Sequence, residues 1–116
     1  MAQDIEELRN ALREFAQARD WGQFHSPKNL AASLSIEAAE VLEHFQWLTD
    51  EQSRHLDEDT RQAVAMEIAD VLIYLIQLAD KLGIDPIQAA RDKMLINARN
   101  YPADQPRGSI RKRSEP

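Results

Sequence analysis

The sequence lacks cysteine altogether, and it contains only three glycines, five prolines and 6% aromatic residues among its 116 positions. Without cysteine, the chain has no disulfide framework, no thiolate nucleophile and no cysteine-ligated zinc site. Glycine and proline most often interrupt regular structure, so their scarcity favours long helices. No segment alternates polar and apolar residues over a useful length, as a half-buried strand would. These absences exclude thiol-dependent classes and favour a helical protein.

Positive charge is also in short supply. Lysine and arginine together number 14 against 20 acidic residues, which gives a net charge of -6. A nucleic acid polymer is therefore not an expected partner, because phosphate contacts need a basic surface. The longest apolar run, VLIYLI, is too short to cross a bilayer, and the acidic N-terminus does not resemble a secretory signal. We expect a cytoplasmic protein with no membrane contact.

Start and stop signals divide the chain into four main helices. Ser26-Pro27 and Asp85-Pro86 each place a capping residue before a proline at the first helical position, and Gly83 is typical of a helix end. The expected helices cover about residues 4–19, 27–48, 58–82 and 86–100, with a helix break at Gly22 and one short helical turn after Thr49. The pattern predicts an all-α fold, with one domain over 1–102 and a flexible polar tail over 103–116.

Four carboxylates interrupt the apolar pattern of two of these helices. Glu37 and Glu40 lie in SIEAAEVLEHFQW, and Glu67 and Asp70 lie in EIADVLIYLIQLAD. At 100° per residue, Glu37 falls about 20° from Leu30, at the edge of the apolar face. The acids therefore form a strip with apolar residues on both sides, which is unlike a solvated helix face.

The helix expected over 58–82 is apolar around most of its circumference. A helix of this kind is covered from several directions. Four helices of this length cannot easily provide that cover, so we expect a bundle completed by another subunit.

Carboxylates gathered in a partly apolar pocket repel one another and lose hydration. A divalent cation removes the conflict, and an all-oxygen ligand set suits Mg²⁺ or Mn²⁺. One alternative stays open: the acids are ordinary surface charges paired with nearby basic residues, namely Lys28, Arg61, Lys81 or Lys93.

The spacing Glu37-x-x-Glu40 followed by Glu67-x-x-Asp70 resembles the signature of the MazG-like, all-α nucleotide pyrophosphohydrolases. The blocks FAQARDWGQFHSPKNL, EAAEVLEHFQW, EIADVLIYLIQLA and DKMLINARNYP resemble its dCTP pyrophosphatase branch, over about residues 5–102. The resemblance implies hydrolysis of a nucleoside triphosphate to the monophosphate and pyrophosphate. It favours dCTP or a modified dCTP as substrate and nucleotide pool sanitation as the role.

The resemblance also assigns roles to individual residues. It implies that Mg²⁺ is held by Glu37, Glu40, Glu67 and Asp70, with Glu40 as a candidate catalytic base. The substrate-binding residues that it implies are Trp21, Gly22, Gln23, Phe24, His25, Trp47, Tyr74, Lys93, Asn97 and Tyr101. For each tryptophan, simple core packing is the alternative. Leu12 stands where some dCTP-cleaving relatives have a histidine, so the match does not extend to this position. The family implies a homo-oligomer, with a tetramer favoured over a dimer.

The sequence argues against one other function and leaves two alternatives open. A di-iron carboxylate bundle needs Glu-x-x-His pairs, and Glu40 and Asp70 stand where histidines would be required. A non-catalytic helical interaction module would bind no metal. The same fold could also act on another phosphate substrate, such as phosphoribosyl-ATP.

Overall fold

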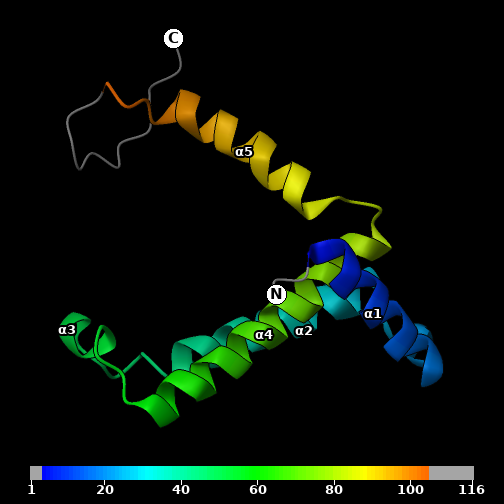
Figure 1. Cartoon of the computed structure of the whole chain (residues 1–116), viewed down its shortest axis with the longest axis horizontal. Coiled ribbons are helices and arrows are strands. Elements are labelled where there is room, and N and C mark those ends of the chain that lie inside the picture. Colours follow the sequence, from blue (N-terminus) through cyan, green and yellow to red (C-terminus); the bar gives the residue numbers. More distant parts are fainter. Residues whose placement is uncertain (1–3, 105–116) are drawn as a thin grey trace. The chain divides into compact units, whose positions relative to one another are not determined.

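The computed structural model describes residues 4–104, and within that range all regular structure is helical (Figure 1). The helices are α1 (Ile5–Ala18), α2 (Pro27–Glu43), α3 (Asp50–Ser53), α4 (Glu58–Lys81) and α5 (Pro86–Asn100), with a 3-10 turn, η1, at Trp21–Phe24. The prediction of an all-α fold with four main helices is confirmed. Most of the predicted tail, from residue 105 onward, lies outside the described residues. The chain divides into two units, Met1–Gly83 and Ile84–Pro116, and each is described by itself.

Side-chain caps set the helix starts. The N-cap residues of the four main helices are Asp4, Ser26, Asp57 and Asp85. At the first three, the side-chain oxygen accepts a hydrogen bond from the backbone N–H three residues on, at 2.8, 3.1 and 2.7 Å. Thr49 and Gln52 form a reciprocal capping box at α3. These contacts satisfy backbone donors that the helices leave free.

The end of α2 differs from the prediction. The helix stops at Glu43 instead of continuing to about Leu48, and residues 44–47 form turns. The N–H groups of His44 and Phe45 bond to carbonyls three residues back, which tightens the last turn. Thr49 must also be extended (ψ 166°) to cap α3, so the chain leaves the helix before it. The part of the predicted helix beyond Glu43 is therefore wrong.

The sequence predicted a helix break at Gly22, but the break after α1 occurs at Asp20. Asp20 has a φ of 53°, in the left-handed region, while Gly22 lies within η1 and does not have a positive φ. Aspartate tolerates this conformation better than most residues because its side chain is short and polar. Gly83 does take the expected position after α4, with a φ of 66°.

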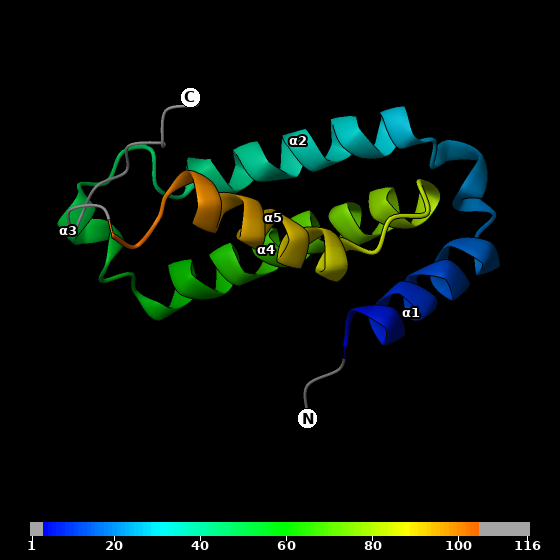
Figure 2. The same cartoon turned by 90° about the horizontal axis from the view of Figure 1, so that it is seen from above.

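In the Met1–Gly83 unit, α2 and α4 run side by side, as both views show (Figure 2). The buried apolar residues in the described part of the chain are Leu30, Val64, Ile76 and Ala79. Helix α1 contacts α4 but contributes no buried residue. Large apolar side chains of α4 stay exposed, namely Ile68, Leu72 and Leu75 on one side of the helix and Met66 on the opposite side. The packing thus places α2 and α4 at the centre and leaves an apolar face of α4 uncovered.

By length and composition alone, α4 could cross a membrane, since it has 24 residues and its most apolar stretch has a mean hydropathy of 1.5. The central helix of a water-soluble protein passes the same test. Helix α4 packs along α2 and carries Glu67 and Asp70, and carboxylates are costly within a bilayer. We therefore describe α4 as the central helix of its unit.

Candidate functional site

The pairing of α2 with α4 brings the predicted carboxylates together. Glu37 on α2 and Glu67 and Asp70 on α4 each offer one oxygen, and these three oxygens lie within 4.8 Å of one another. Oxygen ligands lie about 2.0–2.6 Å from Mg²⁺ or Ca²⁺, so two ligands of one ion are at most about 5 Å apart. The observed separations fit a shared cation.

Glu40 belongs to the same cluster. A hydrogen bond with the Glu40 carboxyl group is the largest cause that raises the pKa of Glu37, to about 7, followed by burial and by the charges of the neighbouring acids. The pKa of Glu67 is also raised, again first by a hydrogen bond with Glu40 and then by burial. The four carboxyl groups therefore interact as one network, and the network readily holds a proton.

Two oxygens of the network have no partner among the described residues. These atoms are Oε2 of Glu37 and Oε2 of Glu67, both buried and without a hydrogen bond. A buried carboxylate oxygen without a partner is costly, and a divalent cation would satisfy both atoms. The residues therefore fit a cation, and a donor set made only of carboxylate oxygens is one that a hard cation prefers.

Ordinary ion pairing does not account for these acids in the described residues. The ion pairs there are Arg9–Glu6, Arg13–Asp80, Arg54–Glu51, His55–Glu51 and Arg61–Glu58. None of them includes a member of the cluster, and Arg61 pairs locally at 3.5 Å. The alternative of solvated, ion-paired surface acids finds no support in these contacts.

The segment predicted to bind the base forms η1 and its C-cap, His25. The Trp21 ring meets Phe15 of α1 edge-on, with ring centroids 5.5 Å apart, and it meets His25 in the same way at 6.3 Å. The guanidinium of Arg19 lies 3.5 Å from the Phe15 ring centroid. Trp21 keeps 42% of its surface exposed, so part of the ring is available to a ligand.

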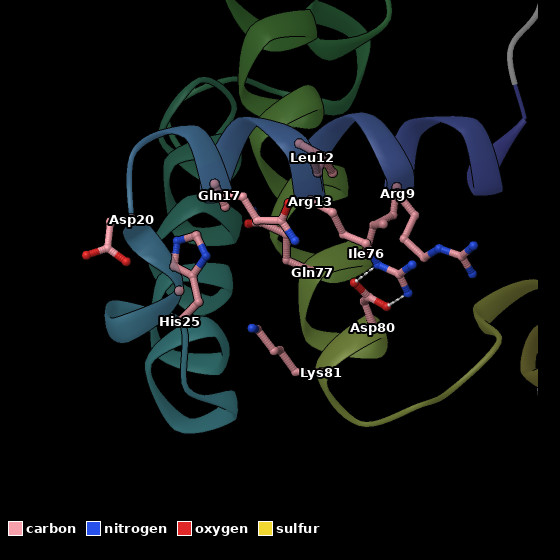
Figure 3. Close-up of a pocket in the computed structure, with 12 residues that line it drawn as sticks. Arg9, Leu12, Arg13, Gln17, Asp20, His25, Ile76, Gln77, Asp80 and Lys81 are labelled. Carbon is pink, nitrogen blue, oxygen red and sulfur yellow. Dashed lines mark hydrogen bonds and ion pairs between the residues drawn. The ribbon is translucent and has the colours of Figure 1, made fainter.

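A pocket of about 250 Å³ lies between α1, η1 and α4 (Figure 3). Among the predicted substrate residues, Gly22 and His25 line it, together with Leu12 of α1. Gln77 of α4 also lines it. Because Gln77 follows Asp70 by seven residues, both lie on the same face of α4, about 10 Å apart along the axis. The pocket therefore continues the face of α4 that carries the acids.

The other predicted substrate residues are spread over the chain. Trp47 lies in the turns after α2 and is 86% exposed, and Tyr74 is half-buried on α4, seven residues after Glu67. Gln23 and Phe24 lie in η1, where the Gln23 side chain donates to the backbone carbonyl of Asp20. In the Ile84–Pro116 unit, α5 carries Lys93 and Asn97, and Tyr101 is its C-cap. Their part in substrate binding stays a prediction.

Sequence reasoning did not single out Arg13 and Asp80, which meet in the wall of the pocket (Figure 3). Nε of Arg13 donates to Oδ2 of Asp80 at 2.8 Å, and Nη2 donates to Oδ1 at 2.5 Å. The hydrogen bond from Arg13 lowers the pKa of Asp80 below its ordinary value. The sequence gives no local indication that two charges 67 residues apart are in contact, and each is typical of a solvated charge on a helix surface.

Comparison with known proteins adds the family and its members. The family model described as MazG-like matches residues 32–115. The chain is 43% identical to dCTP pyrophosphatase 1 of Homo sapiens over 113 residues, which cover 96% of this chain and 66% of the human protein. It is 42% identical to the Bos taurus protein of the same name over 107 residues, covering 90% and 63%. The chain thus spans slightly less than two thirds of the length of these curated relatives.

The chain is also similar to a protein of known structure, over almost the whole length of that protein. The crystal structure of a pyrophosphatase from Archaeoglobus fulgidus superposes with a TM-score of 0.81 at 48% sequence identity. The match covers 88% of this chain and 95% of the archaeal chain. The helical fold described above is therefore shared with a solved pyrophosphatase.

Proposed function

Because this chain belongs to the MazG-like family, as the sequence motifs predicted, we propose that it is a nucleotide pyrophosphohydrolase. It would cleave a nucleoside triphosphate to the monophosphate and pyrophosphate. The observation that carries this proposal is the cluster of Glu37, Glu40, Glu67 and Asp70, with two buried oxygens that lack partners. Similarity to dCTP pyrophosphatases favours dCTP or a modified dCTP as substrate and nucleotide pool sanitation as the role.

The four carboxylates would hold Mg²⁺, with Mn²⁺ as a substitute. When bound, the cation neutralises triphosphate charge and makes a coordinated water easier to deprotonate. Glu40 is the candidate base for the proton of the attacking water, because it belongs to the cluster and is the largest cause of the raised pKa of Glu37 and Glu67. The pKa of about 7 at Glu37 describes the cluster before a cation binds, and a bound cation would keep its carboxylate ligands ionised. No covalent nucleophile is needed.

The substrate side of the proposal uses the pocket next to the acids. The exposed part of Trp21 would stack on the base, and His25 would contact a polar edge or a phosphate. Leu12 lines the pocket and offers no hydrogen bond, so recognition of the base falls to the remaining residues. The other proposed contacts are Gly22, Gln23, Phe24, Trp47, Tyr74, Lys93, Asn97 and Tyr101.

The assembly that we propose is a homo-oligomer, a tetramer in preference to a dimer. The exposed apolar residues of α4, such as Ile68 and Leu75, supply the surface for such contacts. The proposal also places the protein in the cytoplasm, without a nucleic acid polymer or a membrane as a partner.

Pyrophosphate release from a panel of dNTPs, NTPs and phosphoribosyl-ATP tests the proposal, with Mg²⁺ and with EDTA. Metal-dependent release that is strongest with dCTP or its modified forms supports it, provided that Glu40→Gln abolishes the release. Arg61→Gln, which removes only a local surface ion pair, is the matched control. Release from phosphoribosyl-ATP alone would change the substrate class. Absence of release from every compound would point to the interaction module.

A further inference from the structure

The ion pair between Arg13 and Asp80 differs from every other side-chain hydrogen bond among residues 4–104. Its partners are 67 residues apart, whereas all the others join residues at most five apart. It is therefore the one side-chain polar contact in this range that connects two main helices. The Asp80 side chain is 19% exposed, so the pair is partly shielded from water and salt.

Little else fixes the position of α1. No residue of this helix is buried, so apolar packing alone restrains it weakly. The two hydrogen bonds from Arg13 are parallel and directional, and a guanidinium held in this way orients the backbone that carries it. The pair is thus the one directional side-chain contact between α1 and α4 among residues 4–104.

The position of α1 affects the shape of the pocket, because residues of this helix form part of its wall. Phe15 of α1 contacts the Trp21 ring, and Trp21 in turn contacts His25, which lines the pocket. Both Arg13 and Asp80 line the pocket themselves (Figure 3). A shift of α1 would therefore move the pocket wall and the aromatic group at its end.

We propose that Arg13 and Asp80 act as a positioning pair that sets the width of the pocket beside the acidic face of α4. The proposal rests on the proposed nucleotide hydrolysis. The two charges neutralise each other and neither belongs to the carboxylate cluster. Loss of the pair therefore weakens substrate binding and leaves the metal-dependent step nearly unchanged.

Steady-state kinetics with the preferred triphosphate test the proposal on Arg13→Gln, Asp80→Asn and the charge-swapped double variant Arg13→Asp with Asp80→Arg. We expect each single substitution to raise KM by roughly 5- to 20-fold, while kcat changes by less than about twofold, because misplaced binding walls act on substrate positioning. The swapped variant should recover most of the loss in KM. Arg61→Gln, the control on a local ion pair, should leave both constants unchanged.

Hydrogen exchange of the α1 amides is the second readout, since it needs no substrate. Faster exchange in α1, but not in α2, is expected in both single variants and should be reversed in the swapped variant. If a single variant fails to fold, Arg13→Lys replaces it, because lysine keeps the charge and loses the paired geometry. Its KM should rise by a smaller factor.

An unchanged KM in the single variants overturns the proposal, and so does a loss confined to kcat. Unchanged exchange in α1 overturns it as well, because the pair would then not hold the helix. Absence of pyrophosphate release by the wild-type protein refutes the proposed function instead. In that case the exchange measurement still decides whether the pair positions α1.

Discussion

Helix α4 carries two groups of charge that the protein treats in opposite ways. Glu67 and Asp70 join Glu37 and Glu40 in a cluster of one sign, where the pKa values of Glu37 and Glu67 are raised. Ten residues after Asp70, Asp80 meets a guanidinium, and its pKa is lowered. The same helix thus holds one charge group without a counter-ion in the described residues and one group that is fully matched.

The difference between the carboxylate cluster and the Arg13–Asp80 ion pair indicates a different role for each. A charge matched within the chain is complete, and it serves the structure by joining α1 to α4. A cluster of like charges with unpartnered buried oxygens is costly as it stands, and under the proposed function a cation would complete it. The following predictions test that contrast, beginning with the largest effect.

Removing one charge from the unmatched cluster should cost the most. We expect Glu40→Gln to lower kcat/KM by at least about 100-fold, because the amide neither accepts the water's proton nor serves as an anionic ligand. Asp80→Asn, which removes a matched charge, should leave kcat within about twofold. Pyrophosphate release measures both. Equal losses of kcat in the two variants would contradict the contrast.

Adding the missing counter-ion should stabilise the protein. At 100 times its dissociation constant, a cation that binds only the folded state adds about 2.7 kcal/mol to the free energy of unfolding. Thermal unfolding with MgCl₂, against NaCl at equal ionic strength, measures this gain. In Glu67→Gln the gain should shrink, because one ligand is lost. A rise in Tm of the same size with NaCl would show that only screening is at work.

The unmatched cluster should also destabilise the metal-free protein as the pH rises. The pKa of Glu37 is about 7 in the folded protein, above its ordinary value of 4.5, so protonation of this group favours the fold. That contribution is fully present below pH 4.5 and is lost as the pH rises through 7. Urea unfolding in EDTA between pH 4 and 8 should show this decline, and Glu37→Gln should flatten it. A profile in Glu37→Gln as steep as that of the wild type would refute the assignment.

The matched pair should respond to pH in the opposite direction and by less. Since the pKa of Asp80 is lowered in the folded protein, its ionised form stabilises the fold above the ordinary value of 3.8. That contribution disappears as the pH falls through the lowered pKa. At pH 7, Asp80→Asn should lower Tm by roughly 2–5 °C. Differential scanning calorimetry should show this difference narrowing below pH 4, whereas a difference that persists in acid would point to packing and not charge.

Local sequence signals predicted most of the fold. Asp4, Ser26, Asp57 and Asp85 cap the helices as expected because a cap depends on only three or four neighbouring residues. The end of α2 was predicted five residues too late. The apolar pattern continues past Glu43, and the extended conformation that Thr49 needs to cap α3 outweighs it.

For the candidate site too, residues with a local sequence signal could be predicted, and contacts between distant segments could not. The carboxylates of α2 and α4 could be found because the two members of each pair are three residues apart on one helix, a spacing that helical periodicity places on neighbouring positions. Arg13 and Asp80 could not be found, since their contact depends on how α1 lies on α4. Likewise, the helix break was assigned to Gly22 from the general preference of glycine, whereas Asp20 takes the left-handed conformation after α1.

The small core makes the stability of the protein depend on its concentration. The buried apolar residues in the described part of the chain number four, while Ile68, Leu72 and Leu75 lie exposed on one face of α4. If copies of the chain cover that face, folding and assembly become a single equilibrium governed by mass action. Dilution then acts as a denaturant: Tm falls as the protein concentration falls, and a cell making little of this chain degrades a larger share of it.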